Sequence, residues 1–193
     1  MLPLQERLRL LESDLLARPP RIAVYRELPF AIVPYEPFDE WRLRREVSLL
    51  KGRLEAAGRS VRWVSLADCL WAAIDRCEGL EALVAMERQR GFAAAQAQVT
   101  TYLSDPDWAP LSELVLEHLD RLDPQRDVAF LVHAAAMAPA IYPMSRLLDE
   151  LQGRTEVPAV LFYPGSLEGA TGLRFMDLAG REPMGNYRVK IYG

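Results

Sequence analysis

The chain has 193 residues, half of which are hydrophobic and 26% of which are charged. At roughly 150 residues per domain, this length predicts one domain over residues 1–193, and the composition excludes a disordered chain, a collagen-like chain and a disulfide-built miniprotein. The 23 basic and 27 acidic side chains give a net charge of −4, which argues against a nucleic-acid-binding protein driven by bulk charge.

Helix and strand patterns alternate in the first third of the chain. Residues 4–17 carry leucines along one helical face, and the two prolines that follow predict the end of that helix. Residues 30–33 are a short apolar stretch between prolines, which predicts a short strand. A second amphipathic helix is expected to begin near Asp39 and to end at Gly58. Residues 61–64 predict a second strand.

A run of helices is expected in the middle of the chain. Ser65 is suited to cap a helix over residues 68–76. Further helical patterns cover residues 80–98 and 111–122. We therefore expect a helical elaboration of the domain over residues 66–124.

Acidic side chains concentrate in this middle part. Residues 61–142 contain 12 acidic and 6 basic residues. A solvated acidic helix surface is the simplest interpretation of such an excess, and a docking face for a basic partner is the alternative.

The last third of the chain predicts a β-α-β unit. Residues 128–132 are an unbroken apolar run, typical of a strand covered on both faces. Residues 144–151 predict a short helix and residues 157–163 a second central strand, parallel to the first. Two further strands are expected over residues 172–176 and 187–192. The predicted fold class is α/β: a single domain with a mainly parallel sheet flanked by helices and an antiparallel C-terminal edge.

No cofactor or metal site is predicted. Residues 34–39 follow the first strand, where a nucleotide-binding protein carries its phosphate loop, but they include two prolines and neither glycine nor lysine. The chain also lacks a GxGxxG motif. The two cysteines, Cys69 and Cys77, and the two histidines, His118 and His133, do not have the spacing of a zinc site.

The sequence also lacks a complete catalytic set. None of the three candidate serines, Ser65, Ser145 and Ser166, lies in a GxSxG motif. His133 ends an apolar strand and is interpreted as a core histidine. A hydrolase built from His133, Asp149 or Glu150 is the weakest hypothesis, because no nucleophile has an activating neighbour in the sequence. We therefore expect a protein that is not an enzyme.

Two C-terminal segments are candidate binding elements. Residues 163–172 contain three glycines and two hydroxyls, which could cradle an anion but are more simply a turn between two strands. The second segment is a basic and aromatic strip, whose residues are expected to bind a partner: Arg174, Tyr187, Arg188, Lys190 and Tyr192. Such a strip can stack bases and contact phosphates, and the alternative interpretation is an edge strand protected by charge.

Four segments of the C-terminal third form a specific string of motifs: Arg146–Gly153, Val157–Gly165, Gly172–Met176 and Asn186–Tyr192. This string resembles the signature of the BrxB family, a small component of the BREX (bacteriophage exclusion) defence systems. Residues 35–37, 40–45 and 128–133 fit the general layout of the family more weakly.

This resemblance implies a role within an assembly. The BrxB family has no established catalytic activity, and its members are encoded beside a large ATPase, a methyltransferase and PglZ, an alkaline-phosphatase-like protein. The resemblance therefore implies a non-enzymatic adaptor that docks on PglZ within a defence complex. The alternative hypothesis is a nucleotide- or nucleic-acid-binding subunit of the same system, which would use residues 163–172 with Arg174, Arg188 and Lys190.

No stretch of the sequence approaches the roughly 18 apolar residues of a membrane span. A cytoplasmic protein without membrane contact is expected.

Overall fold

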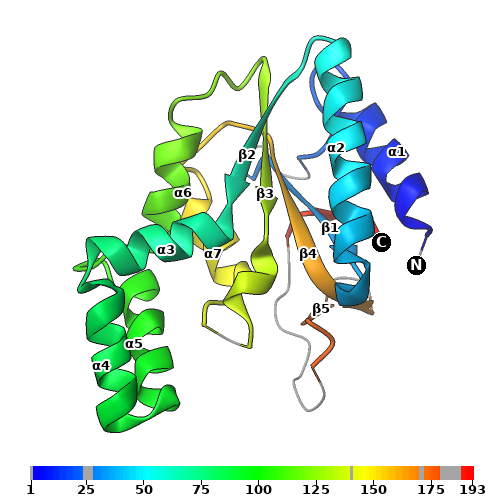
Figure 1. Cartoon of the computed structure of the whole chain (residues 1–193). Coiled ribbons are helices and arrows are strands. Elements are labelled where there is room, and N and C mark those ends of the chain that lie inside the picture. The colour runs from blue at the N-terminus through cyan, green and yellow to red at the C-terminus, as the bar shows by residue number, and fades with distance from the viewer. Residues whose placement is uncertain (1, 24–27, 140, 170–171, 179–187) are drawn as a thin grey trace.

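Parallel strands form the main sheet of this protein in the order β2-β3-β4-β1-β6, and β5 pairs antiparallel with β4 (Figure 1). The computed structural model describes residues 2–23, 28–139, 141–169, 172–178 and 188–193. Within them the strands are β1 (Phe30–Tyr35), β2 (Ser60–Ser65), β3 (Asp127–Val132), β4 (Ala159–Glu168), β5 (Gly172–Phe175) and β6 (Lys190–Ile191).

Helices connect and cover these strands. The α-helices are α1 (Leu4–Leu16), α2 (Glu40–Ala56), α3 (Leu66–Arg76), α4 (Gly79–Arg90), α5 (Phe92–Ser104), α6 (Leu111–Leu119) and α7 (Met144–Leu151). Two short 3-10 helices, η1 (Pro37–Asp39) and η2 (Ala134–Met137), follow β1 and β3.

The central strands are buried on both faces. Every residue of β1 is buried, as are all but the first residue of β3 and the first seven residues of β4. Alternate side chains therefore enter two different apolar clusters. This pattern is typical of a parallel sheet that is covered by helices on both sides, and it confirms the predicted α/β fold class.

The two faces of the sheet have different helical covers (Figure 1). The apolar side chains of α1 and α2 form one cluster with residues such as Val33 and Phe162. On the opposite face, α3, α6 and α7 form the second cluster with residues such as Ile32 and Leu161. The predicted β-α-β unit is confirmed, because β3 and β4 are parallel neighbours joined through α7.

The helical pair α4 and α5 lies away from the sheet. These helices pack mainly on each other and on α3 (Figure 1), around a small cluster of Ile74, Leu83 and Tyr102. The prediction of one helix over residues 80–98 is wrong. Gly91 has a φ of +87°, a conformation that glycine adopts readily, and there the chain turns back and separates α4 from α5.

Residues 163–172 are mostly strand rather than loop. β4 continues to Glu168, and β5 pairs back on it from Gly172 to Phe175. The structure thus agrees with the simpler interpretation of this segment, a turn between two strands. The antiparallel pairing involves β5, whereas β6 lies at the sheet edge and is parallel to β1.

Gly165 is required at the close pairing of β4 with β5. Its φ is +143°, and a Cβ atom at this position would lie 2.0 Å from the carbonyl oxygen of Arg174. We expect Gly165→Ala to lower the free energy of unfolding by about 1–3 kcal/mol, because the two strands would have to separate. Urea denaturation measures the change.

Gly52→Ala is the matched control for this substitution. Gly52 lies inside α2, and apart from its chain neighbours and the adjacent helix backbone no atom lies within 4 Å of the place that an alanine methyl group would take. Alanine should therefore stabilise the helix by up to about 1 kcal/mol. Equal changes in the free energy of unfolding for the two substitutions would contradict the proposed close approach of the strands at Gly165.

Candidate functional site

A cavity of about 350 Å³ opens where β2 and β3 end, beside α2. One part of its lining is apolar and the other part carries polar side chains. The lining residues are Glu40, Leu43, Arg44, Val47, Ser48, Trp63, Ser65, Asp68, Val132, His133 and Phe162. The carboxyl ends of parallel strands are the usual place for ligand sites in α/β proteins.

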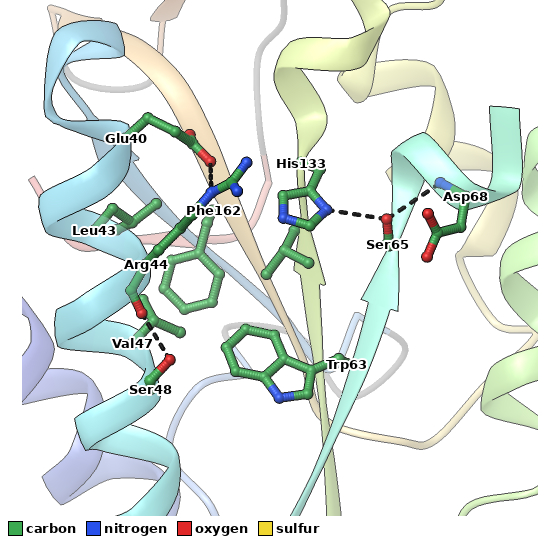
Figure 2. A pocket seen from close by; sticks show the side chains of 11 residues that line it. Glu40, Leu43, Arg44, Val47, Ser48, Trp63, Ser65, Asp68, His133 and Phe162 are labelled. Carbon is green, nitrogen blue, oxygen red and sulfur yellow. Dashed lines mark hydrogen bonds and ion pairs between the residues drawn. The ribbon is translucent and has the colours of Figure 1, made fainter. Parts of the chain in front are cut away.

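Ser65 and His133 meet at the rim of this cavity. Figure 2 shows Ser65 between His133 and Asp68. The Ser65 Oγ lies 3.0 Å from His133 Nδ1 and accepts a hydrogen bond of 3.1 Å from the backbone N–H of Asp68. The serine therefore caps α3, as predicted, and holds the imidazole ring in place.

The chain direction changes at His133. Its φ is +61° and its ψ is +34°, the left-handed conformation, which is uncommon outside glycine although histidine adopts it more readily than most residues. This conformation ends β3 and begins η2. It also directs the imidazole ring toward the end of β2.

A second polar network closes the α2 side of the cavity. The Tyr35 hydroxyl donates a hydrogen bond to Glu40, and Arg44 Nε donates one of 2.7 Å to the same carboxylate. Burial raises the pKa of Tyr35 far above its ordinary value, and the bond to Glu40 acts in the same direction. Tyr35 thus stays a neutral donor that holds Glu40 at the end of β1.

The described polar groups of the cavity do not form a complete catalytic triad. A serine protease-like triad needs a carboxylate that orients the histidine, and among the described residues none is hydrogen-bonded to the second ring nitrogen of His133. The Ser65 Oγ also accepts the hydrogen bond from the Asp68 backbone N–H that caps α3. The lining combines the His133 imidazole, the Arg44 guanidinium and the carboxylates of Glu40 and Asp68 with apolar side chains. A few polar groups among apolar walls are typical of ligand pockets.

The sequence analysis considered Ser65 and His133 separately, as a helix cap and a core histidine. Their meeting follows from strand order, because β2 and β3 are parallel neighbours that end at adjacent positions. The available signal in the sequence was that one predicted strand is followed by Ser65 and another is followed by His133. Trp63, which lines the same cavity, was recognised only as part of a strand.

Two residues of the predicted partner-binding strip are bound within the molecule. Lys190 Nζ lies 2.6 Å from Asp14 Oδ2, and the Tyr192 hydroxyl donates a 2.7 Å hydrogen bond to the same oxygen. Tyr192 is buried. In this structure these side chains therefore fasten β6 to α1.

The other strip residues lie elsewhere. Arg174, on β5, forms an ion pair with Glu168 of β4 at 2.5 Å, and Arg188 is exposed before β6. Tyr187 lies outside the described residues. A role of the strip in partner binding stays a prediction.

Glu150 is engaged in a local network on α7. It accepts hydrogen bonds of 2.7 Å from the Tyr142 hydroxyl and 2.6 Å from Arg146 Nε. Burial acts to raise the pKa of Glu150, but these hydrogen bonds outweigh it and the pKa is lowered. A general acid needs a raised pKa, so this environment does not favour the hydrolase hypothesis.

No metal site is found in the part of the chain that the structure describes, where no three His, Cys, Asp or Glu side chains gather closely enough. Cys69 is buried and Cys77 is partly buried, and both are free thiols. Burial raises the pKa of Cys69 to about 11, so its thiol is protonated at neutral pH. In addition, no helix among the described residues is long and apolar enough to cross a membrane.

Ion pairs between helices use part of the acidic middle of the chain. Arg76 of α3 lies 2.6 Å from Glu117 of α6, and Arg154 lies 2.7 Å from Glu113 of α6. Both pairs are exposed, so each adds little to stability. They show that some acidic side chains of this surface already have basic partners within the chain.

The comparison with protein families adds to this geometry. The family model described as "BREX protein BrxB" matches residues 62–190, which extend from β2 to β6. No curated protein and no solved structure proved similar to the chain. The matched region includes the Ser65 and His133 ends of the cavity but not α2.

The chain belongs to the BrxB family, since the match covers more than half of its length. It is therefore a component of a BREX anti-phage defence system, as the resemblance in the C-terminal motifs predicted.

Ser65→Ala tests the local role of the serine. We expect the free energy of unfolding to fall by about 1 kcal/mol, because α3 loses its cap and His133 its partner. Ser65→Asp is the control, since aspartate also caps helices and should retain most of the stability. Chemical denaturation compares the three proteins, and an unchanged Ser65→Ala variant would contradict the assigned role.

Asp14→Asn tests the attachment of β6 to α1. Burial acts to raise the pKa of Asp14, but the hydrogen bonds from Lys190 and Tyr192 and the nearby positive charges outweigh it, so the pKa lies below the ordinary value of an aspartate. The carboxylate thus stabilises the fold above about pH 4 and loses this effect as the pH falls through its folded-state pKa.

We expect the substitution to cost about 1–2 kcal/mol of unfolding free energy at neutral pH and less in acid. Denaturation at a series of pH values measures both. The exposed Asp75→Asn on α3 is the control, and a pH-independent difference between Asp14→Asn and the unaltered protein would disprove the electrostatic explanation.

Proposed function

We propose that this protein is a non-enzymatic adaptor subunit of a BREX complex, and that it docks on the PglZ-like protein of the same system. Membership of the BrxB family supports the place in a BREX system. PglZ is the partner that the family resemblance implies. The surface of the chain supports the adaptor role.

The observation that carries the proposal is the exposure of tryptophan. All four tryptophans in the chain, Trp41, Trp63, Trp71 and Trp108, retain between 39% and 78% of their accessible surface. Tryptophan is on average a highly buried residue. It is also the residue type most enriched among the energetically dominant positions of protein interfaces. Four exposed indoles therefore favour a protein that is covered by partners.

The exposed aromatic side chains lie on two parts of the molecule. Phe38, in η1, is fully exposed, and Trp41, at the start of α2, is the most exposed of the four tryptophans. The Arg44 guanidinium carbon lies 4.9 Å from the centre of the Trp41 ring, and Arg44 lines the cavity. This surface is therefore continuous with the candidate site. Trp71 and Phe92 are also exposed, on α3 and α5.

Trp41→Ala tests the role of the α2 surface. Because the indole is largely exposed, its removal should leave the unfolding temperature nearly unchanged. If it lies in the interface, the dissociation constant of the complex should rise about 30-fold, which corresponds to about 2 kcal/mol. Purified protein and its PglZ-like partner, studied by mass photometry and calorimetry, provide the measurement.

Leu10→Ala, an exposed apolar residue on α1, is the matched control and should bind normally. Failure of the unaltered pair to associate at micromolar concentration would contradict the adaptor proposal. Purification of the chain with nucleic acid and without PglZ would favour the nucleic-acid-binding alternative.

A further inference from the structure

A second hollow, of about 550 Å³, opens at the end of the sheet opposite to the candidate site. It lies where β2 and β3 begin and where α1 and α2 end, uppermost in Figure 1. Three arginines from separate parts of the chain line it: Arg18 after α1, Arg59 before β2 and Arg126 before β3. The described lining contains no acidic side chain. We call this cavity the arginine hollow.

The charge of the arginine hollow is opposite to that of the chain, whose net charge is −4. The acidic residues next to Arg126 in the sequence bind backbone groups instead. Asp123 accepts a hydrogen bond from the N–H of Gln125, and Asp127 accepts one from the N–H of Asp123. Within the described part of the chain, none of the three arginines forms an ion pair with a carboxylate. The positive charge of the hollow is therefore not neutralised.

Arg59 is a buried cation, with 8% of its surface exposed. Its Nη1 donates a 2.9 Å hydrogen bond to the carbonyl oxygen of Gln125, and its Nη2 donates one of 3.5 Å to that of Ala17. These neutral carbonyls fix the guanidinium group without cancelling its charge. Burial lowers the pKa of Arg59, and the positive charge of Arg18 acts in the same direction. A buried charge is costly unless it is paired, so an anion in the hollow would reduce this cost.

Arg18 and Arg126 distinguish a binding site from a purely structural arginine. Both are exposed, and neither side chain has a hydrogen bond or an ion pair among the described residues. Arg59 alone would be explained by its bonds to the backbone. The two further arginines contribute nothing to these bonds, but they line the same hollow and are free to turn toward a ligand.

The charge and the volume of the hollow indicate the class of ligand. The guanidinium group has its donors in a planar fork that fits phosphate oxygens. A carboxylate has one negative charge, whereas a phosphate monoester carries about −1.5 to −2 at neutral pH and has three acceptor oxygens. Three arginines without an acidic neighbour therefore favour phosphate. The volume also lies within the range of small-molecule sites, about 300–1,000 Å³.

We propose that the arginine hollow binds phosphate groups, with Arg59 as the fixed donor and Arg18 and Arg126 closing on the ligand from the surface. Two sources carry this chemistry: the polyphosphate of a free nucleotide and the backbone of a nucleic-acid strand. This inference goes beyond the adaptor function, because it requires no partner protein.

Calorimetric titration of the purified protein at low salt distinguishes the two sources. The probes are pyrophosphate, ATP and a single-stranded DNA of about ten nucleotides, which is within the usual range of site sizes. Binding of pyrophosphate or ATP, but not of the DNA, would assign the phosphate to a free nucleotide. Binding of the DNA would assign it to a nucleic-acid strand. No binding of any probe at millimolar concentration would overturn the proposal.

The double variant Arg18→Gln, Arg126→Gln tests whether the hollow is the binding site. Because both side chains are exposed, the unfolding temperature of the free protein should change little. Binding of the probe should weaken by about tenfold or more, since charge-assisted hydrogen bonds are lost. The double variant Arg9→Gln, Arg45→Gln removes the same charge from exposed positions on α1 and α2, and it should bind normally. Equal affinities of the two double variants would overturn the assigned site.

Thermal unfolding gives an independent measurement. At a probe concentration ten times the dissociation constant, the unfolding temperature of the unaltered protein should rise by about 3–6 °C. The same probe concentration should produce little rise in the variant without Arg18 and Arg126. A rise of equal size in that variant would place the phosphate elsewhere and overturn the proposal, while the adaptor function would stand.

Discussion

Burial of both faces of a parallel sheet is the constraint on which the rest of this structure depends. Because β1, β3 and β4 are apolar on both sides, helices must cover each face, and the chain supplies α1 and α2 for one and α3, α6 and α7 for the other. The strand added at one end of this arrangement, β2, is only partly covered, with Arg62 and Trp63 exposed. The candidate site lies at this boundary, where the helical cover ends and the carboxyl ends of β2 and β3 remain accessible.

The same boundary carries a feature on which the proposed adaptor function rests. There the exposed Trp63 lines the cavity beside α2. In the interior Trp63 packs edge-on against Phe130, which in turn packs edge-on against Phe162. The exposed ring is thereby held rigidly by the core, so that little entropy would be lost when a partner orders it.

The C-terminal strand shows how the chain uses charge inside the molecule. Lys190 and Tyr192 would be read from sequence as an exposed basic and aromatic pair, yet both bind Asp14, which is 176 residues away from Lys190. Their contacts close the sheet at β6 and attach it to the first helix. Exposed positive charge also lies beside β2, at Arg62 and Arg121.

Local sequence determined which segments became helices and strands and which faces they buried. Leucine spacing predicted α1 and α2, the run over residues 128–132 predicted β3, and Ser65 was correctly recognised as a cap. These features follow from side-chain periodicity and capping, which act over a few residues. The C-terminal motifs also indicated the BrxB family. Tertiary structure decided what no local pattern contains: the order of the strands, the meeting of Ser65 with His133, and the place of β2 at the edge of the sheet. These depend on contacts between residues far apart in the chain, and the lowest free energy of the whole fold selects them.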